Sequence, residues 1–198
     1  MNWVSKMFKK KSLNQADKDF LEAYDAFVTG EKIFKESCSY TETGKNEITI
    51  KTNKEKELEA LHFFDKSIKL GFDESKVFSM RGSILDSLEY YAEALEDYNN
   101  AILRKPKQWV ADNYYRRSLI KNIVQDYEGA LADLKEAIRI SQFDNDDNKY
   151  SNKHYQKIGF KSASEYYKMD LPSAEMHVEF KKRHPSYKDD KLKEIKRR

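Results

Sequence analysis

Histidine, cysteine and clustered acids are the side chains with which this chain could bind a metal ion or attack a substrate. The four histidines, His62, His154, His177 and His184, lack the short spacings that place two ligands on one helical turn. Cys38 has no second cysteine with which to form a disulfide or share a metal ion. Metal binding or nucleophilic catalysis would need residues that converge only in space, so we predict no enzyme and no cofactor.

An acidic run resembles the beginning of a calcium-binding loop but lacks the residues that complete one. Asp144, Asp146 and Asn148 carry oxygen ligands at alternate positions. Lys149 stands where such a loop needs glycine, and Tyr155 stands where it needs a bidentate glutamate. We therefore interpret this run as a polar turn that can cap a helix, without a metal ion.

Two arginine–aspartate pairs recur with the same spacing. Arg81 and Asp97 are 16 residues apart, and so are Arg117 and Asp133. The recurrence predicts an ion pair that joins two helices within each repeat, rather than a catalytic pair. For a partly exposed pair of this kind we expect a contribution of only ~0–1 kcal/mol.

These pairs belong to a sequence repeat with an offset of 36 residues. Tyr91, Ala94, Leu95, Tyr98, Ala101 and Ile102 recur as Tyr127, Ala130, Leu131, Leu134, Ala137 and Ile138. Their three- and four-residue steps follow a helix face, and the small alanines let helix backbones approach closely. Self-similarity with this period is typical of stacked helical pairs, which usually act by binding.

The best units span 75–106 and 111–141, and partial units flank them at 15–71 and 144–171. In the best unit Pro106 ends the second helix. A final helix over 173–183 is predicted to cap the open end of the array. We therefore divide the chain into a basic segment 1–14, a helical repeat domain 15–184 and a charged tail 185–198.

The partial units differ from the best ones. The first combines a helix over 15–37, a loop or short extended segment over 39–53, and a second helix that Gly71 caps. The inward-facing positions of helix 15–37 are predicted to be Phe20, Tyr24, Phe27, Ile33 and Phe34. In the last unit, Tyr150, His154 and Ile158 are expected on the buried side, and Ser173 is expected to cap the final helix.

Charge is distributed unevenly along the chain. Of the net charge of +3, residues 1–15 contribute +4 and residues 178–198 contribute +5, which leaves −6 for the body between them. An acidic body does not resemble a nucleic-acid groove, and we interpret the basic ends as solvated termini. The single cysteine, the lack of an apolar run of membrane-spanning length and the lack of a secretory core favour a cytoplasmic protein.

With these motifs the chain resembles the tetratricopeptide repeat (TPR) family. The matching residues are Phe78, Arg81, Gly82, Leu85, Tyr91, Ala94, Tyr98, Ala101 and Pro106 in one copy, and Tyr114, Arg117, Ser118, Tyr127, Ala130, Leu134 and Ala137 in the next. Lys121 departs from the pattern, which has an apolar residue there. The resemblance implies an all-α fold, a short right-handed α-solenoid of about three to four helix pairs with a C-terminal capping helix.

The resemblance also implies a concave groove lined by the first helix of each pair. Carried onto this sequence, the groove residues are Lys76, Ser79, Ser83, Asp86, Asp112, Tyr115, Arg116, Leu119, Asn122, Asn148, Asn152 and Tyr155. One known use of the family clamps a C-terminal carboxylate with Lys and Asn at set groove positions. Ser79, Ser83, Tyr115 and Leu119 take matching places here, so we predict no clamp of that type.

The resulting hypothesis is a non-enzymatic adaptor or scaffold that binds a peptide or protein segment in this groove. Tyr115 and Arg116 are the predicted anchors, because Tyr and Arg dominate binding hot spots. The acidic body favours a basic or amphipathic ligand, and no small-molecule substrate is expected. The alternative is a regulator that meets a membrane surface or nucleic acid through its basic ends, residues 1–11 and 186–198.

Overall fold

The computed structural model of the chain describes residues 13–42, 48–104, 109–143 and 146–187. Pro106, most of the predicted basic segment, the start of the acidic run and the tail beyond residue 187 lie outside the described residues. Side chains of residues 39–51 and 146–150 are likewise not described.

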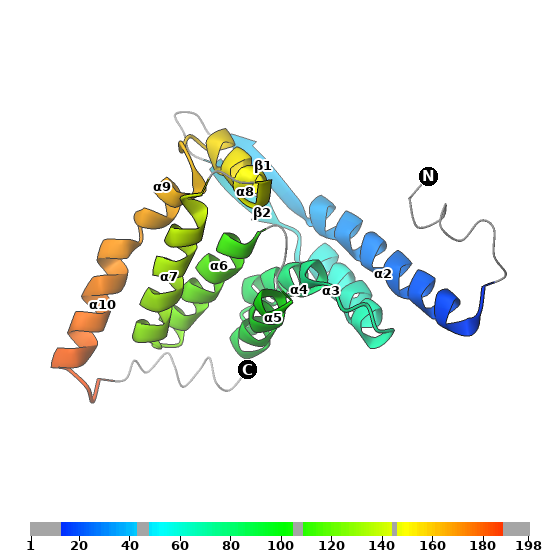
Figure 1. Cartoon of the computed structure of the whole chain (residues 1–198), viewed down its shortest axis with the longest axis horizontal. Coiled ribbons are helices and arrows are strands. Elements are labelled where there is room, and N and C mark those ends of the chain that lie inside the picture. Colours follow the sequence, from blue (N-terminus) through cyan, green and yellow to red (C-terminus); the bar gives the residue numbers. More distant parts are fainter. Residues whose placement is uncertain (1–12, 43–47, 105–108, 144–145, 188–198) are drawn as a thin grey trace.

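The described helices before residue 143 form three pairs that stack in chain order (Figure 1). The pairs are α2 (Gln15–Ser37) with α3 (Lys54–Lys69), α4 (Ser75–Ser87) with α5 (Tyr91–Leu103), and α6 (Val110–Ile123) with α7 (Tyr127–Ser141). Each new pair packs its first helix against the second helix of the pair before it, α4 on α3 and α6 on α5. This arrangement confirms the predicted right-handed solenoid.

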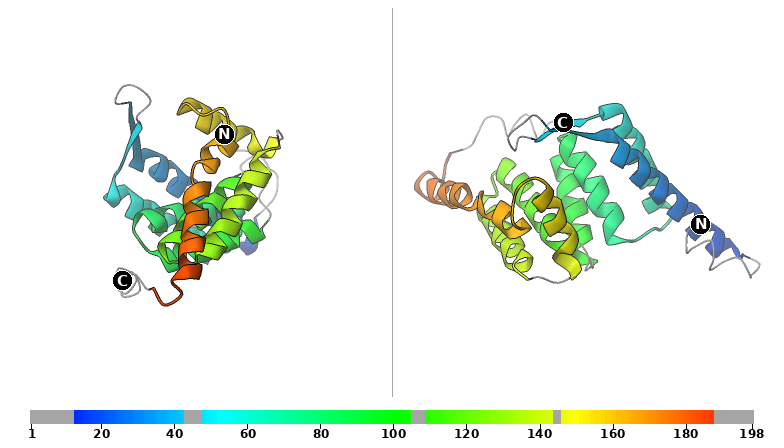
Figure 2. Two further views of the ribbon diagram at one scale, coloured as in Figure 1. Left: turned by 90° about the vertical axis from the view of Figure 1, so that its left-hand side faces the viewer. Right: turned by 90° about the horizontal axis from the view of Figure 1, so that it is seen from above.

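The three remaining described helices are α8 (Asp146–Lys157), α9 (Ala163–Lys168) and α10 (Leu171–Arg183). Both α9 and α10 pack on α7, whereas α8 packs on α9 and on α6. The segment 144–171 therefore does not stack as the first three pairs do. Figure 1 and Figure 2 place α2 and α10 at opposite ends of an elongated molecule.

Local sequence explains where several helices begin and end. Asn14 begins α2 with a capping box, in which its side chain accepts from Asp17 and the Asp17 side chain accepts from its backbone. Gly71 follows α3 with φ = 90°, the left-handed conformation predicted for a C-terminal cap. Glu89 and Gln125, which are 36 residues apart, both have φ = 65° in the turns inside their pairs. The repeat thus extends to the backbone of its turns.

The core follows the repeated small and large residues. Ala94, Tyr98 and Ala101 of α5 are fully buried. In the first pair, Phe27 of α2 packs on Phe64 and stacks on Phe72 with ring centroids 4.9 Å apart. Burial of such aromatic side chains contributes roughly 1.5–3 kcal/mol each.

Two expectations about inward-facing residues were wrong. Phe20 is 42% exposed at the edge of the core, where its ring contacts those of Tyr24 and Phe72. In α8 the buried side carries Ser151 and Tyr155, while His154 is exposed and Ile158 is half-buried. The predicted Tyr150 lies outside the described side chains.

The cap predicted at Ser173 was also wrong, because α10 begins at Leu171 and places Ser173 inside its first turn. The predicted extended segment is a hairpin of β1 (Cys38–Glu42) and β2 (Ile48–Thr52), two antiparallel strands that pair Cys38 with Thr52 and Glu42 with Ile48. It links the two helices of the first pair and leaves the solenoid unchanged.

Candidate partner-binding groove

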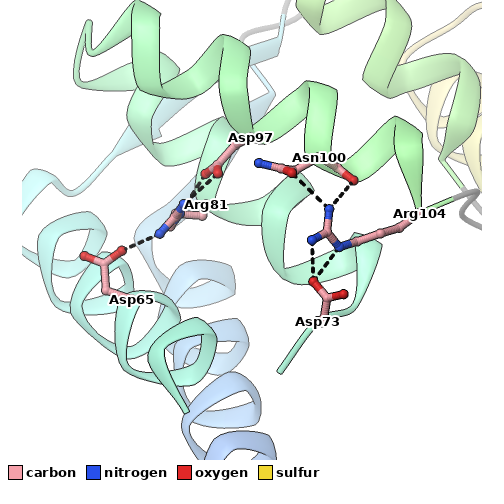
Figure 3. Close-up of polar contacts among 6 residues, drawn as sticks. All are labelled: Asp65, Asp73, Arg81, Asp97, Asn100 and Arg104. Carbon is pink, nitrogen blue, oxygen red and sulfur yellow. Dashed lines mark hydrogen bonds and ion pairs between the residues drawn. The ribbon is translucent and has the colours of Figure 1, made fainter. Parts of the chain in front are cut away.

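An ion-pair network fixes the helices that carry the groove (Figure 3). Arg81 of α4 donates two hydrogen bonds of 2.7 Å to the carboxylate of Asp97 on α5. It donates a third, of 2.8 Å, to Asp65 on α3. One guanidinium therefore joins its own pair to the second helix of the preceding pair.

The next pair repeats this arrangement with one addition. Arg117 donates to Asp133 at 2.7 and 2.6 Å and to Asn99 of α5 at 2.6 Å. Lys121, the residue that departs from the family pattern, places its ammonium 2.8 Å from the same Asp133 carboxylate. The predicted intra-repeat pairs are confirmed, and the departure at Lys121 supplies a second cation.

The burial of these pairs predicts a larger energy than the ~0–1 kcal/mol expected from the sequence. The Asp97 side chain is only 1% exposed and Asp133 only 7%, so neither carboxylate is screened by solvent. Burial raises the pKa of Asp97, and the hydrogen bonds from Arg81 oppose that rise. Removal of one partner from a buried pair costs roughly 3–5 kcal/mol, because the other charge stays behind unpaired.

Polar contacts also connect the first helices along the groove side. Lys76 of α4 forms an ion pair of 2.7 Å with Glu31 of α2, and its ammonium lies over the Phe27 ring. The Ser79 hydroxyl donates to Asn113 of α6 at 2.8 Å. Two of the predicted groove residues, Lys76 and Ser79, therefore hold α2, α4 and α6 together.

Arg116 stands in the open part of this face. It is exposed, and its guanidinium donates to the Ser83 hydroxyl of α4 at 3.3 Å. Among the described residues no carboxylate lies within ion-pair distance of it, but the nearby Tyr98, Asp112 and Asp86 raise the pKa of its guanidinium. Burial raises the pKa of the neighbouring Asp86, and the positive charge of Arg116 opposes that rise.

The hydroxyl of Tyr98 lies next to Arg116 and Ser83. Tyr98 comes from α5 and passes beside Gly82 of α4, where an added Cβ would stand 3.4 Å from the tyrosine ring. Its hydroxyl is buried, and burial raises its pKa to about 12, while Arg116 and Ser83 beside it oppose that rise. Ser83, Tyr98 and Arg116 thus bring several donors to one place, and we call these three residues with Asp86 the Arg116 cluster.

Two exposed apolar side chains, Leu119 and Ile123, follow the Arg116 cluster along α6, and we call them the apolar step. Leu119 and Ile123 lie three and seven residues after Arg116, on the same helix face, and are 38% and 39% exposed. Beside them, between α6, α7 and α10, is a cleft of about 100 Å³ that Leu119, Asn122 and His177 help to line. His177 Nδ1 and Asn122 Oδ1 are 2.9 Å apart and connect α10 to α6.

The other half of the α6 face is covered. Tyr115, a predicted anchor, is only 7% exposed; its hydroxyl donates to Asp170 at 2.7 Å and its ring stacks on Tyr167. Asp112 accepts hydrogen bonds from Ser151, from Tyr155 at 3.1 Å and from Tyr167 at 2.8 Å. Tyr115 is therefore a core residue, because α8 and α9 pack over the beginning of α6.

The remaining predicted groove residues are placed as follows. Asn152 of α8 accepts from the backbone N–H of Ala163 at 3.0 Å and so supports α9. Tyr155 is buried on α8, and the side chain of Asn148 lies outside the described ones. The structure thus brings Ser83, Asp86, Arg116 and Leu119 together on an open face, with Asn122 beside them, and removes Asp112, Tyr115 and Tyr155 from it.

Sequence reasoning missed one contributor to this face, Glu31 of α2, which pairs with Lys76. Tyr98 was assigned to the core, and its full burial confirms that assignment. Among the described residues no cluster of three His, Cys, Asp or Glu side chains could hold a metal ion, and no helix is long and apolar enough to cross a membrane.

Comparisons with solved structures define the class of fold. PcrH, in complex with the chaperone binding region of PopD, has 14% sequence identity, with 85% of this chain and 98% of PcrH covered and a TM-score of 0.55. The first TPR domain of human RPAP3 has 18% identity, with 83% and 97% covered and a TM-score of 0.53. The Sgt2 TPR domain from Aspergillus fumigatus has 15% identity, with 85% and 87% covered and a TM-score of 0.51.

No family model matches the chain, and no curated protein matches its sequence. Its similarity to solved TPR domains therefore concerns the fold. The repeated pattern, the stacked pairs and these structures agree that the chain has the TPR fold.

Proposed function

We propose that this chain is a non-enzymatic interaction module that binds a peptide or protein segment in the groove of α2, α4 and α6. The observation that carries the proposal is the open half of the α6 face, where the Arg116 cluster adjoins the apolar step of Leu119 and Ile123. Exposed Arg next to exposed aliphatic side chains is typical of binding surfaces.

The same face suggests an amphipathic partner. A hydrogen-bond acceptor of the bound segment would meet the donors of Arg116 and Ser83, and an apolar side chain would cover Leu119 and Ile123. The acidic body beyond the groove would favour basic residues elsewhere in the partner. PcrH, which shares the fold, was solved with a segment of another protein bound, so the fold itself can hold a polypeptide.

We further propose that the module acts as an adaptor or scaffold in the cytoplasm. The single Cys38 suits a reducing compartment, because it cannot form an intramolecular disulfide.

The experiment is affinity capture from source-cell lysate followed by titration of the captured segment. Arg116→Glu and Leu119→Asp are each expected to weaken binding at least about tenfold, since each places a charge where the partner contacts the groove. Arg139→Glu, the same charge reversal on an exposed residue of α7, is the matched control and should bind as the wild type does. Circular dichroism of all three variants is the check that their helices are kept.

Tyr98→Phe adds a subtler variant. It removes a fully buried hydroxyl beside Arg116 and Ser83 that a bound segment cannot reach, so binding should change much less than in Arg116→Glu. Equal binding by the wild type and both groove variants would contradict the proposal. Loss of binding only after deletion of residues 1–11 and 186–198 would favour the alternative, a regulator held at a membrane or nucleic acid by its ends.

A further inference from the structure

A second, polar cleft lies away from the groove and is lined by residues from the end of α7, from α8 and from α9 and the segment before it. It has a volume of about 400 Å³, and the described residues that line it are Ser141, Gln142, Asn152, Gln156, Lys161, Ser162 and Ser164. These side chains are hydroxyls, amides and one ammonium. The cleft shares no residue with the Arg116 cluster or with the apolar step.

One wall of this cleft contains a buried hydroxyl that the fold leaves unsatisfied. Ser164 is 6% exposed, and its Oγ has no hydrogen-bond partner. An unsatisfied buried hydroxyl costs roughly 1–3 kcal/mol, so such groups are rare in native proteins and often explained by a ligand or an ordered water.

The hydrogen bonds already made leave the cleft rich in donors. Asn152 Oδ1 accepts from Ala163, which leaves the Asn152 NH₂ group for another acceptor. Ser162 Oγ accepts from the Glu165 N–H at 3.2 Å, which leaves its O–H. Within the described residues the Lys161 ammonium forms no ion pair. A ligand for this cleft should therefore be an acceptor with negative charge.

Local charge agrees with that requirement, although the body of the chain is acidic. Between residues 151 and 168 there are four lysines, Lys153, Lys157, Lys161 and Lys168, and one acid, Glu165. The Glu165 carboxylate accepts from the backbone N–H of Lys161 at 2.5 Å and does not line the cleft. This segment thus carries a net charge of +3, or +2 when the first residues of α8, with Asp146, Asp147 and Lys149, are included, and Lys161 is its cation at the cleft.

We propose that this cleft binds a phosphate monoester carried by a small molecule, with Lys161 as the cation and Asn152, Ser162 and Ser164 as neutral donors. A dianionic phosphate offers several acceptor oxygens, so it can engage the ammonium and these donors together. The volume is that of a small-molecule site and leaves room for the group that carries the phosphate. This site is independent of the groove and adds a ligand that the sequence did not lead us to expect.

The test is a titration of the full chain with glycerol 3-phosphate, followed by amide NMR shifts, with glycerol at matched ionic strength as the blank. We expect saturable shifts confined to residues 141–142, 152–156 and 161–165. Lys161→Gln should weaken binding about tenfold, because it removes the one cation of the cleft. Lys168→Gln removes a charge from the same segment outside the cleft, and its affinity should stay within about twofold of the wild type.

Ser164→Ala separates ligand binding from folding. It removes the unsatisfied hydroxyl, so the melting temperature should stay constant or rise while binding weakens about threefold. No saturable shifts, or equal weakening by Lys161→Gln and Lys168→Gln, would overturn the proposal. Binding of a phosphoserine peptide or of phosphatidic acid vesicles, but not of glycerol 3-phosphate, would overturn the small-molecule assignment.

Discussion

The pairs α4/α5 and α6/α7 share a sequence pattern, yet their groove faces differ. Both carry the same bidentate Arg–Asp contact, at Arg81–Asp97 and Arg117–Asp133, and both turn through a residue with φ = 65°. The face of α4 is held by contacts to α2 and α6. The face of α6 is covered by α8 and α9 over its first turns and open only from Arg116 onward.

The interiors of the two pairs differ in a compensating way. Gly82 faces Tyr98 in one pair, and Ser118 takes the place of Gly82 where Leu134 takes the place of Tyr98. A larger residue on one helix thus accompanies a smaller residue on the other, which keeps the packed volume similar. The comparison teaches that the repeat specifies each pair, while segments outside the repeat decide which face remains available to a partner.

The largest expected effect concerns the buried Arg–Asp contact that the two pairs share. Asp97→Asn and Asp133→Asn should each lower the free energy of unfolding by about 3 kcal/mol, because each leaves an arginine without its buried carboxylate. Urea denaturation followed by circular dichroism measures both. A loss below about 1 kcal/mol, the value for an exposed pair, would show that solvent screens these contacts after all.

The next largest effect concerns α8 and α9, which cover the beginning of α6. Tyr167→Phe removes a 2.8 Å hydrogen bond to the buried Asp112 and should cost about 1–2 kcal/mol, since the acceptor is charged. Hydrogen exchange should then speed up in α8 and α9 but not in α4 and α5. Tyr155→Phe is the internal comparison, and its longer 3.1 Å bond predicts a smaller loss. Uniformly faster exchange over all helices would contradict a local cover.

A smaller effect separates the two ion-pair arrangements. Leu85 in one pair and Lys121 in the next occupy the same place, and Lys121→Leu restores the family pattern. The Lys121 side chain is partly exposed and Arg117 remains on Asp133, so we expect a change within about 1 kcal/mol. Thermal melts at low and high salt measure it. A loss as large as that of Asp133→Asn would make Lys121, rather than Arg117, the main partner.

The smallest effect is a pKa shift in the open part of the groove. Burial raises the pKa of Asp86 and the charge of Arg116 opposes that rise, so Arg116→Gln should raise the pKa of Asp86 further. Carboxyl carbon NMR titration measures the shift, and an unchanged pKa would show that the two groups do not interact.

The raised pKa of Asp86 also predicts a pH dependence. Because its folded-state pKa lies above the unfolded value, ionisation of Asp86 opposes folding. Asp86→Asn should therefore stabilise the protein relative to the wild type at neutral pH, and the gain should vanish below about pH 4.

Much of the solenoid could be predicted because its evidence is local and repeated. The three- and four-residue steps of Ala94, Tyr98 and Ala101, the glycine at the end of α3 and the spacing of Arg81 and Asp97 all lie within one unit. The candidate site was only half predicted. Arg116 and Leu119 are exposed, and their contact with a partner stays a prediction, whereas the predicted anchor Tyr115 is buried under α8 and α9.

The sequence by itself determined the helix pairs, their order and the ion pairs within them, because each depends on residues at most about one repeat apart. Only the tertiary structure decided which groove residues are free. The hydrogen bonds of Asp112 with Tyr155 and Tyr167 join residues 43 and 55 positions apart, and no local pattern encodes such contacts. Tyr115 is buried because α8 and α9 pack over the beginning of α6. Which segment of the chain packs over a side chain is decided by the tertiary structure.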